Sequence, residues 1–323
     1  MGITSKERDT VLRFIERNVR VAPRDLDEGI GTVYERVVID DYFRDLQKRC
    51  NLKNILENPA DGVTGVPGMN SLEFARNGAT VTLSNPSDKM LDGARAVWVN
   101  QGLVDQATFV KCPVDQMPFE DDTFDMVWNY CMFERFKDPS TLVAEMKRVS
   151  NRYVLIMTQN VYNWGTMFHK VYHNIGNLEW DHGYDEQMTF PAIRKALREQ
   201  GMHLLEEGTV DIPPWLDTWD MPLRGVLKQL LGSVGMKWEW KISSPSNGSS
   251  NGHAHTANGH SHAHSHAHAA NGNGNGNGHA TGVGSGTSKS SLPMVNVVRD
   301  IEHNLPTWFR KYQAHHLYIL AEK

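Results

Sequence analysis

The sequence predicts an α/β protein whose mainly parallel β-sheet is covered by helices on both faces. Three observations support this prediction. Strand-like segments alternate with helix-like segments along residues 51–212. Hydrophobic residues make up 40% of the 323-residue chain, which is enough for a substantial core. An apolar run close to the C-terminus, His316 to Ala321, is typical of a further buried strand.

Two helices are expected before the first strand, and they form an N-terminal part over residues 1–50. In the first helix, Thr4 and Glu7 have the spacing of a capping box, and the apolar residues between Val11 and Val19 fall on one face. The second helix is expected from about Val33 to Cys50.

Beyond residue 50 the apolar period alternates between that of a strand and that of a helix. The expected strands are Asn54–Glu57, Thr80–Ser84, Thr108–Cys112, Phe124–Asn129, Tyr153–Thr158 and about His203–Ile212. The expected helices are about Asn70–Arg76, about Ser87–Asn100, a helix with Asp138 as its N-cap and Pro139 at its first position, and Phe190–Glu199. Residues 160–188 are expected to be irregular and are rich in aromatic side chains.

A low-complexity segment interrupts the chain at residues 243–291, which are almost wholly Ser, Asn, Gly, His, Ala and Thr. Such a composition cannot bury enough apolar surface to fold, so we expect the segment to be disordered. Because a strand of core type follows it, the segment is predicted to be an insertion within a domain. Residues 292–323 then complete the sheet.

Charge and composition limit the classes of function. Lys and Arg number 33 against 38 Asp and Glu, and the net charge of −5 argues against a nucleic-acid binder. No apolar run approaches the ~20 residues of a membrane helix. Three cysteines without C-x-x-C spacing, and a start without an apolar leader, favour a cytoplasmic protein. The oligomeric state cannot be predicted.

Three segments carry a resemblance to a known family. The stretch Asp115-Gln-Met-Pro-Phe-Glu-Asp-Asp-Thr-Phe-Asp125-Met-Val resembles the "LPF-x-D-x-x-FD-x-V" signature of class I S-adenosylmethionine-dependent methyltransferases. Leu142-Val-Ala-Glu-Met-Lys-Arg-Val149 is similar to the "L-x-E-x-x-R-V" helix of that family, and Val81 to Leu91 resembles its second strand and turn. Order and spacing agree over roughly residues 50–212.

The resemblance implies a Rossmann-like sheet of seven strands, with the last strand antiparallel and inserted beside the fifth. It makes residues 51–242 a methyltransferase-like domain that binds S-adenosylmethionine and methylates a small or medium organic acceptor. Glycine loops and helix N-termini at strand ends are where such folds bind nucleotides. The cofactor-binding residues that it implies are Glu57, Asn58, Asp61, Gly62, Gly65, Asn85, Pro86, Asp115 and Asn129.

The first cofactor motif departs from the family pattern. Glu57 matches the acidic residue of the motif, but Pro59, Asp61 and Val63 occupy the positions of the three glycines of G-x-G-x-G. Proline fixes φ and removes a donor, whereas glycine lets a ligand approach the backbone. Asn85 replaces the acidic residue that binds the ribose, and Asp115 is a substitute for the adenine-reading acid. A catalytically inactive, methyltransferase-like binding protein is therefore the alternative. A dehydrogenase-like nucleotide binder fits less well, because its G-x-G-x-x-G motif is poorly matched.

Acceptor contacts are expected after strand four and in the aromatic stretch, which would form a lid over 160–188 that excludes water. The candidates are Tyr130, Phe133, Tyr162, Trp164, His169 and Tyr184. Ordinary aromatic packing explains these residues equally well. Asp181 and His182 are candidates for a catalytic base, although a lone histidine is more often structural.

The insertion holds imidazoles at every second position: His260, His262, His264, His266 and His268. Such tracts can chelate divalent metal. A solvated spacer is the simpler interpretation. If metal binds there, the tract would act as a buffer or tether, because no cysteine accompanies it.

Overall fold

The computed structural model describes residues 3–17, 29–60, 66–177, 180, 182–212, 229, 233 and 293–323. The chain divides into one compact unit made of Met1–Ser244 and Lys289–Lys323 and a second made of Pro245–Ser288. All described residues belong to the first unit. The predicted insertion lies outside them, so its disorder stays a prediction. Among the described residues, no helix is long and apolar enough to cross a membrane.

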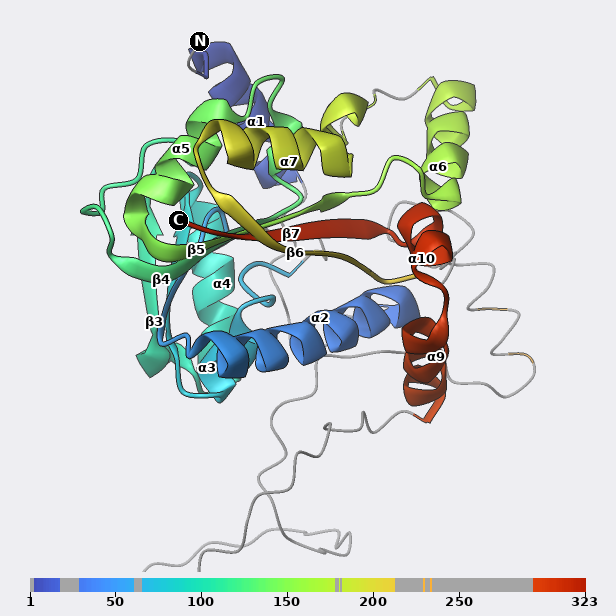
Figure 1. Ribbon diagram of the computed structural model, residues 1–323, viewed down its shortest axis with the longest axis horizontal. Coiled ribbons are helices and arrows are strands. Elements are labelled where there is room, and N and C mark those ends of the chain that lie inside the picture. The colour runs from blue at the N-terminus through green and yellow to red at the C-terminus, as the bar shows by residue number, and fades with distance from the viewer. Residues whose placement is uncertain are drawn as a thin grey trace, which may run out of the picture. The chain divides into compact units, whose positions relative to one another are not determined.

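The described residues form a seven-stranded sheet with the order β3-β2-β1-β4-β5-β7-β6 (Figure 1). The strands are β1 (Asn54–Glu57), β2 (Thr80–Asn85), β3 (Ala107–Lys111), β4 (Phe124–Tyr130), β5 (Ser150–Gln159), β6 (His203–Val210) and β7 (His316–Glu322). Strands β1 to β5 pair in parallel, and β7 runs antiparallel to both β5 and β6. The predicted fold class is confirmed, including the antiparallel last strand beside the fifth.

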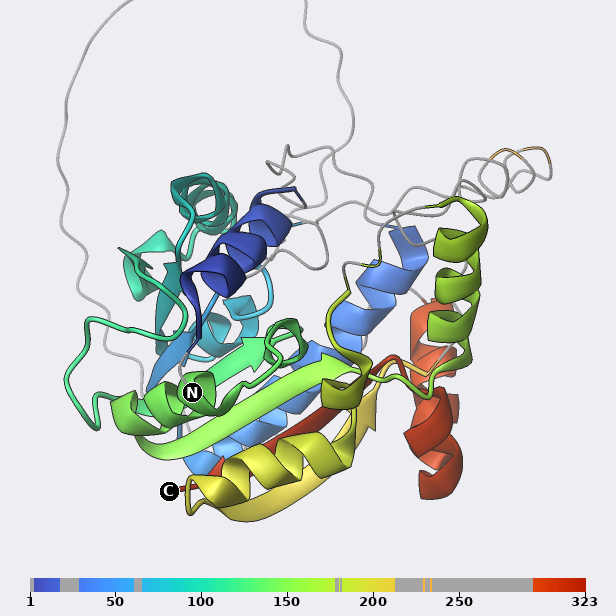
Figure 2. The ribbon, with the colours of Figure 1, turned by 90° about the horizontal axis from the view of Figure 1, so that it is seen from above.

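Helices cover both faces of this sheet, and Figures 1 and 2 show α2 on the opposite face from α5 and α7. The helices are α1 (Ser5–Arg17), α2 (Gly29–Cys50), α3 (Leu72–Arg76), α4 (Asp88–Asn100), α5 (Ser140–Val149), α6 (Trp164–Ile175), α7 (Phe190–Glu199), α9 (Pro293–Asn304) and α10 (Thr307–Gln313). Short 3-10 turns lie at Val104–Gln106, Phe133–Arg135 and Asp185–Gln187. One apolar cluster unites the sheet with α2, α3 and α4, and a second unites it with α1, α5 and α7.

Strand β7 is apolar on both faces because it lies between two layers of helices. Tyr318 and Leu320 belong to the cluster under α2, whereas Leu317, Ile319 and Ala321 belong to the cluster under α7. This alternation follows from the period of two in a strand. It confirms the faces predicted from the sequence.

The starts of helices α1, α2 and α5 can be compared with the predictions, and two of them differ. The capping box of α1 forms as predicted: Glu7 N–H donates to Thr4 Oγ1 at 3.2 Å, and Thr4 N–H donates to Glu7 Oε2 at 3.0 Å. Helix α2 begins four residues earlier than expected, at Gly29. Helix α5 begins at Ser140 with Pro139 as its N-cap, although Asp138 Oδ1 still accepts from Ser140 N–H at 3.1 Å.

The prediction that residues 160–188 are irregular is wrong for α6. The Asn163 side chain accepts a hydrogen bond from Thr166 N–H and so caps this helix. Trp164, Phe168, Val171 and Ile175 recur at helical spacing, a signal that the abundance of aromatic residues obscured.

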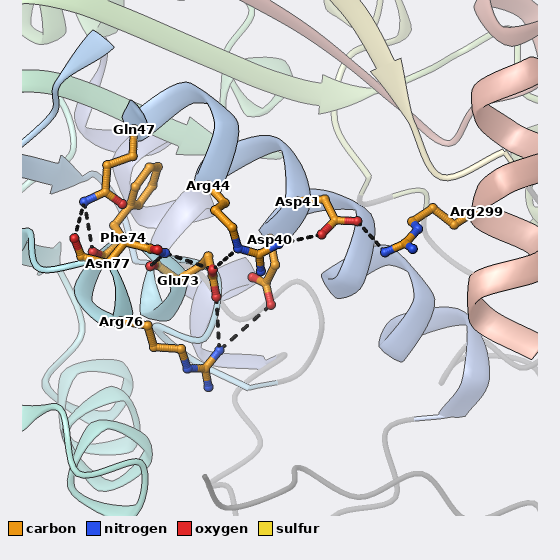
Figure 3. Close-up of polar contacts among 9 residues, drawn as sticks. All are labelled: Asp40, Asp41, Arg44, Gln47, Glu73, Phe74, Arg76, Asn77 and Arg299. Atoms are coloured by element: carbon orange, nitrogen blue, oxygen red, sulfur yellow. Dashed lines mark hydrogen bonds and ion pairs between the residues drawn. The ribbon is translucent and has the colours of Figure 1, made fainter. Parts of the chain in front are cut away.

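A network of charged and amide side chains fastens α2 to α3 and α9 (Figure 3). Arg44 binds Glu73 at 2.7 Å, and Arg299 of α9 binds Asp41 at 2.8 Å. Gln47 Nε2 donates to the carbonyl of Phe74 at 3.2 Å. Asp40 lies within this network, where burial and then the Glu73 carboxylate raise its pKa to about 7.

Candidate active site

Polar side chains meet where β1, β2 and β4 end. Glu57, the last residue of β1, is fully buried, and Ser71 Oγ donates to its Oε2 at 2.6 Å. Trp128 Nε1 of β4 in turn donates to Ser71 Oγ at 3.1 Å. The carboxylate that ends β1 is thus oriented by α3's N-cap residue and by the neighbouring strand.

Asn58 joins three segments at this edge. Its Nδ2 donates to the Val114 carbonyl at 2.7 Å, and Ser84 Oγ of β2 donates to its Oδ1 at 2.8 Å. Both amide atoms are buried, and each takes part in one of these hydrogen bonds. Asn58 therefore positions the segment that carries Asp115 relative to β1 and β2.

Asn85 ends β2 and builds the turn into α4. Its Oδ1 accepts from Ser87 N–H at 2.9 Å, and its Nδ2 donates to the Ala60 carbonyl at 3.0 Å. Pro86 lies half-buried in the same turn. The turn uses one lone pair of Oδ1, so a ribose hydroxyl at this position would have to donate to the second one.

Asp115 is held by a residue from the first helix. Arg8 Nε donates to Oδ1 at 3.0 Å and Arg8 Nη2 donates to Oδ2 at 2.6 Å, while the Asp115 side chain is wholly buried. Ser87 Oγ also donates to Glu16 Oε1 of α1 at 3.0 Å. Figure 2 shows α1 beside α4, so α1 spans the same edge of the sheet.

Asn129 and its neighbours occupy the end of β4. The Asn129 Nδ2 faces Met146 Sδ at 3.3 Å, and among the described residues its buried Oδ1 has no hydrogen-bond partner. Tyr130 is fully buried, with its hydroxyl 3.0 Å from Nε2 of His316. Phe133 is fully buried in the cluster with α5 and α7. In this state Tyr130 and Phe133 are core residues.

A group of buried titratable side chains around Tyr130 was not anticipated from the sequence. His316 Nδ1 lies 3.2 Å from Glu35 Oε1, and the ligand atoms of Glu35, Asp211 and His316 lie within 4.8 Å of one another. Burial and then Asp211 raise the pKa of Glu35, whereas burial and then His315 lower the pKa of His316 to about 3. These residues come from α2, the end of β6 and β7, so no local spacing could have linked them.

The aromatic candidates lie just before α6, on α6 and in the loop after it. Tyr162 is 55% exposed and its ring lies 5.9 Å from that of Tyr312. Trp164 packs against Phe168 within α6. Tyr184 N–H donates to the Glu134 carbonyl at 2.8 Å, which attaches this loop to the turn after β4. Their role as an acceptor lid stays a prediction.

His169 and His182 lie together, with ring centres 4.4 Å apart. Asp181, predicted as the partner of His182, lies outside the described residues, as do Asp61, Gly62 and Gly65 of the glycine loop. The tract histidines His260, His262, His264, His266 and His268 also lie outside them.

The edge suits a ligand rich in donors and positive charge. The groups gathered there are acceptors: the Glu57 carboxylate, the Asp115 carboxylate and Asn129 Oδ1, which has no hydrogen-bond partner in the described part of the chain. An adenine amine, ribose hydroxyls, an ammonium and a sulfonium would complement them. The residues therefore fit S-adenosylmethionine in chemical type, provided that the ligand shares Asp115 with Arg8.

Part of the chain is similar to known methyltransferases. Residues 63–154 match the family model described as a methyltransferase domain. Over 90 residues the chain is 32% identical to the ubiquinone/menaquinone biosynthesis C-methyltransferase UbiE of Marinomonas sp., a match that covers 27% of this chain and 36% of that protein. The match thus spans about a third of the length of that relative.

Two solved structures are similar in outline. Magnesium protoporphyrin IX methyltransferase from Synechocystis PCC 6803, with S-adenosylhomocysteine bound, is 20% identical and has a TM-score of 0.45, covering 65% of this chain and 90% of its own. A SAM-dependent methyltransferase from Aquifex aeolicus is 15% identical and has a TM-score of 0.39, covering 65% and 94%. Similarity at this level says nothing about the substrate of this chain.

Proposed function

We propose that this chain, which carries the methyltransferase domain of the class I S-adenosylmethionine-dependent methyltransferases, transfers a methyl group from S-adenosylmethionine to a small or medium organic acceptor. The observation that supports this most is Glu57, the acidic residue of the first cofactor motif, which is buried and oriented where β1 ends.

When bound, the cofactor supplies an electrophilic methyl on its sulfonium. The chain's own residues would bind the cofactor and orient it. Glu57 would accept hydrogen bonds from the cofactor, Asn129 Oδ1 offers an acceptor that no described residue occupies, and Asn58 keeps the neighbouring segments in register. Methyl transfer by in-line attack depends mainly on positioning and on exclusion of water, so an enzymatic base is optional.

A methyltransferase-like protein that binds without catalysis is the second candidate. It is favoured by Asn85 and Asp115, whose side chains are already bonded to Ser87, Ala60 and Arg8. The comparisons lend it no support of their own. A dehydrogenase-like function finds no support in the comparisons either, because the family model that matches residues 63–154 is that of a methyltransferase domain.

Calorimetric titration of the full chain with S-adenosylmethionine tests the proposal. We expect binding in the wild type and a loss of ~1.5–3 kcal/mol in Glu57→Ala, because a charge-assisted hydrogen bond is removed. Glu120→Ala is the matched control, since Glu120 is exposed. The absence of heat at millimolar cofactor would leave only the non-catalytic candidate. Binding without production of S-adenosylhomocysteine across a panel of small acceptors would do the same.

A further inference from the structure

Three histidines gather on α6 and in the loop that follows it. His169 and His173 are four residues apart on α6, so they share one face of the helix. His182 approaches them from the following loop. The ring centres lie 4.8 Å apart for His169 and His173, 4.4 Å for His169 and His182, and 5.3 Å for His173 and His182.

We propose that His169, His173 and His182 form a binding site for a zinc ion. One nitrogen from each imidazole lies within 4.8 Å of the others. Nitrogens bound to one tetrahedral zinc at ~2.0–2.1 Å are ~3.4 Å apart, so small side-chain rotations complete the site. Three imidazoles leave the fourth position of a tetrahedral zinc open to water or to another ligand.

The donor type selects the metal. Imidazole suits zinc, copper, iron and nickel rather than magnesium or calcium, which prefer oxygen. All three histidines are half-buried, so an ion has access from solvent while the rings remain partly enclosed. Trp180 packs against the group, with its ring centre 4.6 Å from that of His182 and 5.5 Å from that of His173. Contact with the Trp180 ring restricts the rotation of these two imidazole rings.

The backbone around the site is held in place from both sides. At the start of α6, Asn163 caps the helix, and Asn160 Nδ2 donates to the Ala314 carbonyl at 2.8 Å in the segment before β7. On the loop side, Gly183 has a φ of +106°, and a Cβ there would lie 2.4 Å from the Glu134 carbonyl oxygen. Lys170 pairs with Asp185 across the same loop. The histidines are therefore presented by anchored elements, as a preorganised site requires.

The test must separate this site from the histidine tract. The parent protein is the full chain with all eight histidines of residues 243–291 replaced by alanine. Zinc titration by calorimetry should give one site per parent chain. His169→Ala, His173→Ala or His182→Ala should each weaken zinc binding at least ~10-fold, whereas His203→Ala, at an exposed position on β6, should not.

Two further readouts make the result independent of any effect on catalysis. Cobalt(II) bound to the parent should show the intense visible bands of low-coordinate cobalt, and each single variant should lose them. Zinc should raise the melting temperature of the parent and of His203→Ala but not of the three variants. Circular dichroism checks that each variant folds. The proposal fails if the parent binds no zinc, or if folded single variants bind it as tightly as the parent.

Discussion

Arg8 and Asp115 are 107 positions apart in the chain, yet the guanidinium of Arg8 donates hydrogen bonds to both carboxylate oxygens of Asp115. Asp115 is wholly buried, while 36% of the Arg8 side chain is exposed. The pair couples α1 to the edge of the sheet at which we expect the cofactor. The first helix is therefore part of the candidate site rather than a separate appendage.

Arg8→Ala should destabilise the protein, because it leaves a buried carboxylate without its charged partner. We expect the free energy of unfolding in urea to fall by about 1–2 kcal/mol, a value kept low by the exposure of Arg8. Arg13→Ala, on an exposed position of the same helix, should change it little. Adding Asp115→Asn to Arg8→Ala should restore part of the loss. An equal effect of both arginine variants would refute a specific role for the pair.

Ile319→Ala should be costly because β7 pairs with a strand on each side. Ile319 is fully buried, and removing such a side chain costs ~2–5 kcal/mol. Ile301 on α9 offers the same substitution at a residue that is 55% exposed, where we expect less than ~1 kcal/mol. Urea unfolding of both variants measures the difference. Similar losses would mean that β7 is only loosely packed.

Asp40 should make stability fall as the pH rises. Burial and Glu73 raise its pKa from 3.8 unfolded to about 7 folded, so between these values the folded state binds more protons. Stability from this group is present at low pH and is lost as the pH climbs through about 7. Relative to wild type, Asp40→Asn should therefore gain stability between pH 4 and 7.

The slope of that gain is at most ~1.4 kcal/mol per pH unit. It should be smaller here, because 16% of the Asp40 side chain is exposed and Arg76 lies 3.9 Å away. Urea unfolding of both proteins at several pH values measures it, and the other carboxylates cancel in the difference. If the difference in stability between the two proteins does not vary with pH, the pKa of Asp40 is not raised in the folded state.

Gly183→Ala should disturb the loop that carries His182. A side chain there suffers both the positive φ and a collision with the Glu134 carbonyl. Gly78 has a φ of +88°, and no described residue lies within 4 Å of a Cβ built there, so Gly78→Ala measures the cost of the positive φ alone, ~1–2 kcal/mol. We expect Gly183→Ala to lower the melting temperature more than Gly78→Ala and to weaken zinc binding. Equal melting temperatures would show that the loop can move away.

The sheet could be predicted because its signals are local. The period of the apolar residues predicts each strand and most helices. The apolar run from Leu317 to Ala321 predicts a strand with neighbours on both sides, which the structure contains. The sequence does not predict helix α6, because the many aromatic residues of this stretch obscure its helical spacing, and in the structure Phe168 is 60% and Ile175 81% exposed. Such a stripe does not mark a face that packs on a core.

The candidate site could be predicted only as far as its position along the chain. The ends of β1 and β2 place Glu57 and Asn85 at one edge, since parallel strands end together. Their partners could not be foreseen. Arg8 reaches Asp115, and His316 reaches Glu35, through folding that brings together residues more than a hundred positions apart. A pattern within one helix or strand carries no information about such pairs.

The place of β7 between β5 and β6 has a consequence for synthesis on the ribosome. Strand β6 ends at Val210 and β7 begins at His316, so their appearances are separated by several seconds at ~5–20 residues per second. Throughout that interval β5 and β6 lack the strand that joins them, and their backbone edges can pair with other nascent chains. Ribosomes that stall within residues 243–291 should therefore release fragments that aggregate, and chaperones that shield those strand edges should reduce the aggregation.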